Sequence, residues 1–345
     1  MDSTRNGGPP PSLPLARPLH ERLLIGATAL FLAGASVLVG CRLLGTDAVT
    51  PVPQLLAFLP WMLVPISAAL LLTGLLRWRT GAVWALALLA VAGWSVRMYD
   101  MGYATGAQAA AGPWGTHGPA VARIEVLTSN VEFGQATPAL IETLRREKPD
   151  VVFVQECEYV CAQLLAARVP RADYPYRHVV KAGQAEGSAI LSVFPLTPTD
   201  GITGTLAMPG SATRIGGLPV QLQLVHPLPP VPGAVDDWRA ELGRIRTYAA
   251  GQKGAPLILA GDFNATRDHA AFRSVLDAGA LRDSAVLAGA GCAPSWPAGV
   301  RAPLGAQIDH VLVSEDFTVR SARFLELADT DHRSLLVGLD LHARR

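Results

Sequence analysis

The chain has 345 residues, enough for one large domain or two ordinary ones, and half of its residues are hydrophobic. The formal net charge of +1 argues against a broad electrostatic grip on nucleic acid. Four cysteines are too few for a disulfide scaffold, and most of the apolar excess lies in the first hundred residues.

The first hundred residues consist of a polar tail followed by apolar runs. Residues 1–22 are rich in Pro and Gly and predict a flexible cytoplasmic tail. Apolar runs follow at about 23–44, 55–76 and 82–98, and each is close to the roughly 20 residues that a helix needs to cross a bilayer. A cleaved signal peptide would explain only the first run, and helices of a soluble core would need a polar stripe. We therefore expect about three transmembrane helices.

Arginines set the expected orientation of these helices. The tail and the turn after the second run are basic, with Arg5, Arg17, Arg22, Arg77 and Arg79. Because positively charged flanks stay in the cytoplasm, the third helix is expected to end outside it. Residues 99–119 are rich in Gly and Ala and predict a linker. The sequence thus predicts a multi-pass protein of the cell membrane whose second domain, residues 120–342, is extracytoplasmic.

From residue 120 onward, short apolar runs alternate with turn residues. Strands are expected over 121–127, 151–155, 189–193, 220–225, 257–260, 308–313, 318–325 and 335–341. Helices are expected from Thr137 to Pro149, from Asp236 to Gly251, and over 268–276. Strands outnumber helices, which favours a layered sandwich of sheets flanked by helices over a Rossmann-like sheet.

A carboxylate and a carboxamide follow the buried run at 257–260. Gly261 is expected to allow a sharp turn, and an extended backbone would point Asp262 and Asn264 to one side. An acid that holds a cation or a water, beside an amide that donates without adding charge, suits chemistry on a phosphate. Asp and Asn after a strand are most often turn formers, so this motif gains weight from the residues that accompany it.

Similar polar residues recur where the other predicted strands end. They are Asn130, Glu156, His226, Asp309 with His310, and Asp331 with His332. A site built in this way would lie on rigid elements at one rim of the sandwich. We expect His310 to pack or to face solvent rather than to join this site.

In these motifs the chain resembles the endonuclease/exonuclease/phosphatase superfamily, which includes DNase I-like nucleases, abasic-site endonucleases, neutral sphingomyelinases and inositol polyphosphate 5-phosphatases. The matching segments are Ser129-Asn130, Val154-Gln155-Glu156, His226-Pro227, Gly261-Asp262-Phe263-Asn264, Ile308-Asp309-His310 and Thr330-Asp331-His332-Arg333. Short matches in the family's order are far more specific than any one alone. The resemblance implies an α/β (α+β) fold, a four-layer αββα sandwich of the DNase I-like type, and hydrolysis of a phosphate ester with Mg²⁺ or Mn²⁺.

The resemblance also implies which residues bind the metal and the phosphate. Glu156 is similar to the family's main metal ligand. Asn130 resembles the amide that orients the metal shell and the phosphate, and Asp331 would hold a second metal or support the first, so one or two ions stay open. Asn264 and His226 would contact the phosphate, His226 by donating to a non-bridging oxygen as charge builds there.

The remaining implied roles are catalytic. His332 resembles the histidine at the attack centre, and Asp309 the carboxylate that fixes its tautomer. Asp262 resembles the residue that orients or deprotonates the attacking water, and the sequence leaves open whether Asp262 or His332 takes the proton. Trp296 and Arg333 could line the cleft, but a packed Trp and a solvated Arg are the favoured interpretation.

The substrate stays undetermined between nucleic acid and a lipid head group or another small phosphate ester. Residues 120–342 carry many Arg, few Lys and a similar number of acids, which gives no broad basic surface. The competing function is a non-catalytic binding or scaffold protein on the same fold, and that reading predicts gaps among the site residues. No obligate protein partner is indicated. A disulfide among Cys157, Cys161 and Cys292 would require that region to lie outside the cytoplasm.

Overall fold

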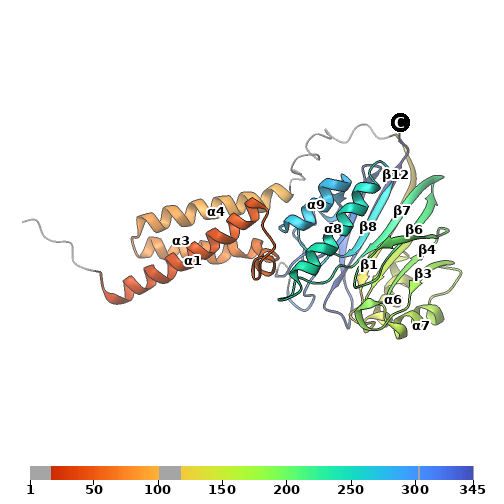
Figure 1. Cartoon of the computed structure of the whole chain (residues 1–345), viewed down its shortest axis with the longest axis horizontal. Coiled ribbons are helices and arrows are strands. Elements are labelled where there is room, and N and C mark those ends of the chain that lie inside the picture. Colours follow the sequence, from red (N-terminus) through yellow and green to blue (C-terminus); the bar gives the residue numbers. More distant parts are fainter. Residues whose placement is uncertain (1–16, 101–117, 302–303, 345) are drawn as a thin grey trace, which may run out of the picture.

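The structure is a computed structural model, and it describes residues 17–100, 118–301 and 304–344. Most of the expected tail (1–22) and linker (99–119) falls outside the described residues. The described chain forms a helical part and a two-sheet part that lie end to end (Figure 1).

The helical part follows the three apolar runs. Its elements are α1 (Leu19–Leu44), α2 (Val52–Leu56), a 3-10 helix η1 (Leu59–Met62), α3 (Leu63–Leu75) and α4 (Arg79–Asp100). The second run is divided ahead of Pro60, whose ring nitrogen has no hydrogen to continue the bonds of an α-helix. Within the described residues, α1 and the Arg79–Val96 part of α4 are long and apolar enough to cross a membrane, whereas Leu59–Leu75 is a shorter apolar helix.

The three longer helices pack together around a small apolar core. Leu32 and Leu38 of α1, Ile66 of α3, and Ala85 and Leu88 of α4 are buried in it. Many large apolar side chains on the outer faces of the same helices are exposed. The helices therefore form a bundle that is apolar both inside and outside.

Two six-stranded sheets make up the second part. The first sheet has the order β11-β12-β1-β2-β4-β3, and the second has the order β5-β6-β7-β8-β10-β9. The strands of the first sheet are β1 (Ala120–Asn130), β2 (Val151–Gln155), β3 (Tyr176–Val180), β4 (Ser188–Ser192), β11 (Phe317–Glu326) and β12 (Arg333–His342). Those of the second are β5 (Thr197–Ile202), β6 (Met208–Ile215), β7 (Leu218–Val225), β8 (Leu257–Asp262), β9 (Arg282–Asp283) and β10 (Asp309–Val313).

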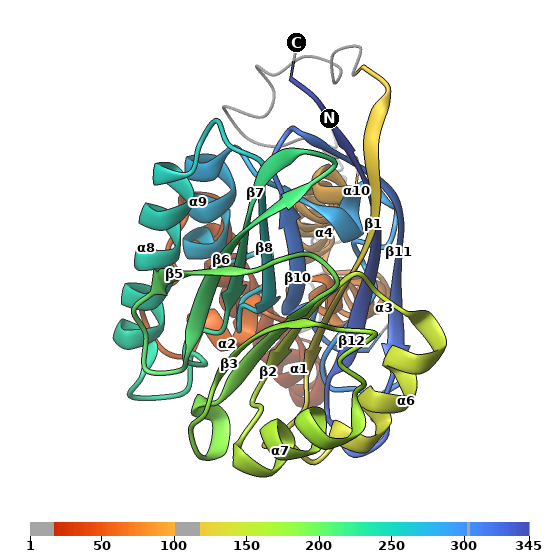
Figure 2. The same cartoon turned by 90° about the vertical axis from the view of Figure 1, so that its right-hand side faces the viewer.

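Helices cover the outer face of each sheet. Apart from the short η2 (Gln184–Glu186) and α10 (Ser284–Leu287), these are α6 (Thr137–Glu147) and α7 (Tyr159–Arg168), and α8 (Val235–Gly251) and α9 (Ala270–Gly279). In Figure 2, α8 and α9 lie on one side of the sheets and α6 and α7 on the other. One apolar core lies between the sheets, with Phe153 and Phe317 in it, and two others lie under the helix pairs. The predicted four-layer αββα sandwich is confirmed.

The sequence prediction missed the strands β3, β5, β6 and β9 and the helix α7, as well as the short η2 and α10. β5 is mostly exposed, and β3 is only half-buried, so neither shows the alternation of a covered strand. The start of α7 was hidden because its cap is Glu158, whose carboxylate accepts from the backbone N–H of Val160 and Cys161. Residues with weak periodicity thus depend on tertiary contacts for their structure.

The helical part contacts loops at one end of the sandwich. Arg42 Nε, at the end of α1, donates to Asp268 Oδ1 at 2.8 Å, and both side chains are buried. Trp61 Nε1 donates to the carbonyl of Gly305 at 3.1 Å, and Asp47 Oδ2 accepts from the N–H of Ala271 at 2.8 Å. The loops that follow β8 and precede β10, and the start of α9, therefore lie against the helices.

Candidate active site

The first sheet brings three of the expected residues to one end. β1 and β2 are parallel, and Asn130 is aligned with Gln155, so Glu156 follows directly beside Asn130. β12 runs antiparallel to β1 and begins at Arg333. His332 therefore precedes β12 at the end of the sheet where β1 and β2 finish.

The second sheet brings three more residues together at one end of its inner strands. β7 and β8 are parallel with Val225 opposite Gly261, which places His226 beside Asp262. β8 and β10 are antiparallel, and Asp262 is paired with Asp309. The expected sharp turn at Gly261 is wrong, because β8 continues through Asp262. Gly261 is instead required because a Cβ there would collide with the carbonyl oxygen of Val225.

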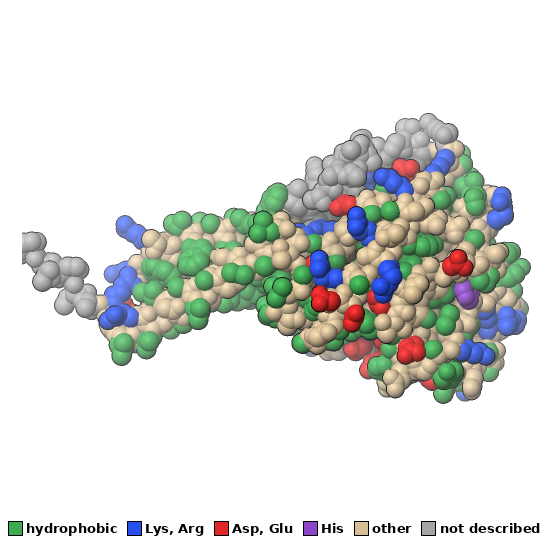
Figure 3. All heavy atoms as spheres, in the orientation of Figure 1, with side chains coloured by type: hydrophobic (Ala, Val, Ile, Leu, Met, Phe, Trp, Pro, Cys, Tyr) green, Lys and Arg blue, Asp and Glu red, His purple; other side chains and the backbone are tan. Residues whose placement is uncertain are grey.

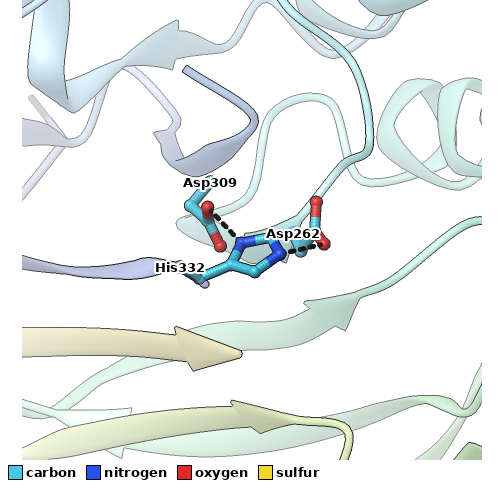
Figure 4. Close-up of side chains that lie close together, drawn as sticks. All are labelled: Asp262, Asp309 and His332. Atoms are coloured by element: carbon cyan, nitrogen blue, oxygen red, sulfur yellow. Dashed lines mark hydrogen bonds and ion pairs between the residues drawn. The ribbon is translucent and has the colours of Figure 1, made fainter. Parts of the chain in front are cut away.

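His332 and Asp309 form a hydrogen-bonded pair across the two sheets (Figure 4). His332 Nδ1 donates to Asp309 Oδ2 at 2.9 Å, and His332 Nε2 lies 3.7 Å from Asp262 Oδ2. The backbone N–H of Asp309 donates to Ser295 Oγ at 3.0 Å, which holds the start of β10. The imidazole is thus oriented by one carboxylate and presents its other nitrogen to a second one.

Glu156 and Asp262 share a donor. Asn130 Nδ2 donates to Glu156 Oε1 at 3.0 Å and to Asp262 Oδ2 at 3.2 Å, while Asn130 Oδ1 accepts from the N–H of Glu132. The N–H of Phe133 donates to Glu156 Oε2 at 3.0 Å. Glu156 has a left-handed φ of 57°, which few residues other than Gly adopt, and such backbone strain is frequent at functional sites. Glu156 and His332 therefore lie in one cluster, linked through Asn130 and Asp262.

His226 faces the same two carboxylates. Its Nε2 lies 3.9 Å from Glu156 Oε1 and 3.8 Å from Asp262 Oδ2, which is beyond hydrogen-bonding distance. Its Nδ1 is buried and has no hydrogen-bond partner among the described residues. His226 therefore has hydrogen-bonding capacity left for a substrate or a water.

Asn264 supports the neighbouring loop. Its φ of 47° breaks the extended path that the sequence suggested, so its side chain does not simply parallel that of Asp262. Its N–H donates to Asp262 Oδ1 at 2.8 Å, and Nδ2 donates to the carbonyl of Pro227 at 3.0 Å. Asn264 thus holds the residue after His226, and its contact with substrate stays a prediction.

Asp331 lies on the solvent-exposed side of the cluster. It is about half exposed, its Oδ2 accepts from Trp296 Nε1 at 2.7 Å, and its Oδ1 lies 3.7 Å from His332 Nε2. Its backbone N–H donates to Glu132 Oε2 at 2.7 Å. The role of Asp331 as a metal ligand stays a prediction.

Burial and neighbouring charges give His332, Asp262 and His226 very different pKa values. Burial lowers the pKa of His332, but Asp309 and Asp262 outweigh it and raise the pKa to about 10. Burial raises the pKa of Asp262 to about 7, although His332 opposes it. Burial, and then the charge of His332, lower the pKa of His226 to about 3. His332 is therefore the cationic side chain of the cluster, and His226 is neutral.

A hard divalent cation fits this donor set. Ligand atoms of Asp262, Asp309 and His332 lie within 4.8 Å of one another, but a protonated His332 has no free nitrogen lone pair, so the carboxylates are the donors for an ion, with Glu156 linked to Asp262 through their shared donor Asn130. One oxygen of Asp309 is buried with no hydrogen-bond partner among the described residues. Mg²⁺ and Mn²⁺ prefer such carboxylate oxygens, whereas softer metals select thiolates. For Asn130 to bind the ion, its amide would have to present Oδ1 to the carboxylates.

His310 lies outside the cluster, as expected. Its ring lies between Asp283 Oδ2 at 2.8 Å and the carbonyl of Ala265 at 3.0 Å, and it is fully buried. Neighbours on a strand point to opposite faces, so His310 points away from the side that Asp309 faces.

The loop before β10 supports the site through Ser295, which the sequence did not single out, and through Trp296, whose packed position was the favoured interpretation. Ser295 accepts from Asp309, and the packed Trp296 bonds Asp331. The expectation of a solvated Arg333 is wrong, because the carbonyls of Pro294 and Ala298 accept from its guanidinium at 3.1 and 2.7 Å. No local pattern marks these residues, because each acts through a segment distant in sequence.

Comparisons with known proteins agree with this arrangement. The model of the Endonuclease/Exonuclease/phosphatase family matches residues 127–332, which is more than half of the chain and spans every expected site residue from Asn130 to His332. No curated protein matches the chain.

Several solved structures share the fold. The structure of D. rerio TDP2 complexed with single strand DNA product has a TM-score of 0.53 and 16% identity, covering 64% of this chain and 99% of that chain. The human Nocturnin catalytic domain with bound sulfate anion has a TM-score of 0.50 and 18% identity, covering 64% and 94%. An endonuclease/exonuclease/phosphatase from Beutenbergia cavernae has a TM-score of 0.50 and 19% identity, covering 64% and 72%. At these identities the likeness shows a common fold.

Proposed function

Because the chain belongs to the Endonuclease/Exonuclease/phosphatase family, and is a hydrolase acting on phosphate esters, we propose that it is a membrane-anchored enzyme that depends on a divalent metal. Water would attack the phosphorus in line with the leaving oxygen. The observation that carries this proposal is the cluster in which His332 bonds Asp309 and faces Asp262, while Asn130 joins Asp262 to Glu156.

The pKa values and the geometry favour different residues as general base and as proton donor. A carboxylate with a pKa of about 7 can accept a proton from water near neutral pH, so we assign the general base to Asp262. His332, with a pKa of about 10, stays protonated and would donate from Nε2 to a phosphoryl oxygen. Asp309 holds the ring in place, and His226 would donate to a second non-bridging oxygen.

Glu156 is our proposed metal ligand, with Asn130 and Asp331 as further candidates. A bound Mg²⁺ or Mn²⁺ would polarise the phosphate and offset its negative charge. The backbone N–H of Phe133 fixes one oxygen of Glu156, so the other is oriented toward Asp262 and the shared donor.

Membrane anchoring is supported by the surface of the helical part. The core helix of a soluble protein or a signal sequence can be equally apolar. A core helix would be mostly buried, however, whereas only 28% of the 18-residue apolar stretch of α1, and 28% of that of α4, is buried. Hydrophobic side chains cover this part, and Lys and Arg gather at the end far from the sheets (Figure 3). That end carries the exposed Arg22 and Arg79, and Arg17 Nη1 donates to the carbonyl of Leu76 there.

The same charges support an extracytoplasmic catalytic domain. Basic flanks remain in the cytoplasm, so the opposite end of the helices, where the sheets are attached, would lie outside. Cys157 and Cys161 form a disulfide, and disulfides persist in oxidising compartments. Charge and redox chemistry thus favour the same orientation.

The test is hydrolysis of bis-p-nitrophenyl phosphate in H₂¹⁸O by the full chain in detergent micelles. Turnover with Mn²⁺ or Mg²⁺, with one ¹⁸O incorporated into p-nitrophenyl phosphate and none into p-nitrophenol, supports direct attack of water on phosphorus. Absence of turnover with both metals, or label in p-nitrophenol, would contradict the proposal. Plasmid DNA and phospholipid vesicles offered in parallel would separate the nucleic-acid and lipid alternatives.

A further inference from the structure

A cavity of about 310 Å³ lies at the junction between the helical part and the sandwich. Its helical wall includes Ala57, Trp61 and Val64 of the α2–α3 region and Val96 of α4, while Arg267 and Gln307 lie on the sandwich side. The helical wall is therefore apolar, whereas the sandwich side combines polar residues with small and apolar ones such as Ala306 and Pro294.

The apolar wall continues into the outer surface of the bundle. Val64 lines the cavity and is also 63% exposed, and Leu71, two turns farther along α3, is exposed as well. Trp61 is held at the cavity by its bond to the carbonyl of Gly305. Exposed apolar side chains of α3 therefore lie both at the cavity and farther along the helix.

The sandwich side of the cavity is formed by the same loops that hold residues supporting the active site. Thr266 lines the cavity two residues after Asn264, and the segment that contains Pro294 and Gln307 also contains Ser295 and Trp296. Ser295 holds the backbone of Asp309, and Trp296 donates to Asp331. The cavity and the cluster around His332 thus share the same two loops.

A second contact ties these loops to the helical part. The rings of Phe58 and Trp296 have centroids 6.3 Å apart, so the residue that bonds Asp331 packs against the segment before α3. Residues of the helical part therefore border the mouth of the site.

From the apolar helical wall, the shared loops and the contact between Phe58 and Trp296, we propose that the cavity binds the aliphatic chain of an amphipathic phosphate ester while its phosphate occupies the site at His332. The inference rests on the proposed function and narrows its substrate class to membrane lipids that carry a phosphate ester. A chain in the cavity leaves water, and a phosphate on the polar side stays near the buried cluster.

The probe is a series of alkyl phosphonates, butyl to decyl, used as inhibitors of bis-p-nitrophenyl phosphate hydrolysis by the full chain in micelles. Each methylene removed from water favours binding by roughly fourfold, and detergent competes for the chain. We expect the inhibition constant to fall at least about tenfold from butyl to decyl phosphonate.

Two substitutions locate the binding of the chain. Val64→Trp fills the cavity and should reduce the ratio of the butyl to the decyl inhibition constant to below about three, and Val96→Trp should act in the same way. Leu71→Trp adds the same ring to the exposed face of α3 outside the cavity and should keep the full ratio. The ratio is taken within each protein, so a change in turnover cancels.

If the inhibition constant of the unmodified chain is the same for butyl and decyl phosphonate, the cavity proposal is wrong, while the proposed function is unaffected. The cavity proposal is also wrong if both Val64→Trp and Val96→Trp keep the ratio of butyl to decyl inhibition constants found in the unmodified chain. Absence of metal-dependent turnover in the unmodified chain would instead overturn the proposed function and, with it, this inference.

Discussion

His332 Nδ1 lies 2.9 Å from Oδ2 of Asp309, although 22 residues separate them in the chain and they lie at the starts of strands of different sheets. Asp309 is the first residue of β10 in the second sheet, and His332 directly precedes β12 in the first. The pair therefore closes the end of the sandwich and orients the imidazole toward Asp262.

Replacing Asp309 tests this orientation. Asp309→Asn should lower kcat by about 10²- to 10⁴-fold, because the imidazole loses the carboxylate that sets its tautomer and charge. The measurement is turnover of bis-p-nitrophenyl phosphate with saturating Mn²⁺. Asp236→Asn removes the same charge from the exposed start of α8 and should leave kcat unchanged. Equal kcat in the two variants would contradict the pairing.

Substitutions of Glu156 and Glu158, which are two residues apart, distinguish an effect on metal binding from an effect on stability. Glu156→Gln should weaken Mn²⁺ binding by at least the roughly 10- to 100-fold that loss of supporting residues causes at metal sites. Glu158→Gln weakens the cap of α7, and should lower stability by about 1 kcal/mol while leaving Mn²⁺ affinity intact. Calorimetric Mn²⁺ titration and thermal unfolding of both variants provide the measurements. Unchanged affinity in Glu156→Gln would remove it as a ligand.

Acid should weaken the junction with the helical part through His269. This fully buried ring donates from Nε2 to the carbonyl of Pro53 and accepts at Nδ1 from the N–H of Thr266. Burial lowers its pKa, although Pro53, Asp47 and Asp268 oppose the shift. The unfolded chain therefore binds a proton below about pH 6.5 that the folded chain excludes, so stability falls as pH decreases from there.

The corresponding measurement is the unfolding temperature between pH 7.5 and pH 5. Asn at position 269 can keep the acceptor for Thr266 and does not titrate, so His269→Asn should show a shallower decline. Other buried histidines, such as His226, contribute to the decline in both proteins. Identical slopes would show that His269 does not carry the effect.

The disulfide reports on orientation. If residues 120–342 are extracytoplasmic, Cys157 and Cys161 should resist alkylation in denatured, unreduced protein purified from cells, while Cys41 is modified. Replacing both with Ser should lower the free energy of unfolding by about 2 kcal/mol, the value for so short a loop. Full alkylation of both, measured by mass spectrometry, would place them in a reducing compartment.

Much of the site could be predicted because its residues follow buried strands. Asp262 comes at the end of an apolar run, and parallel pairing then places it beside His226 whatever the intervening sequence. The helical part was likewise visible from composition, although Pro60 divides its second run. Periodicity and the polar residues at strand ends thus carried most of the fold.

Long-range contacts were beyond local patterns. The buried pair of Arg42 and Asp268 joins residues 226 positions apart, and nothing near either one marks the other. A guanidinium is rarely buried, which favours solvent for Arg333, but backbone carbonyls of a distant loop accept from it. Such partners follow only from the assembled fold.

The most direct test of a metal-dependent phosphoesterase is the turnover of bis-p-nitrophenyl phosphate by the full chain, Glu156→Ala and His332→Ala, each with Mn²⁺ and with excess EDTA. The unmodified chain should turn over only with Mn²⁺, and each substitution should lower kcat by at least about 10³-fold. Turnover that survives in EDTA, or that both substitutions leave intact, would contradict the assignment of the site.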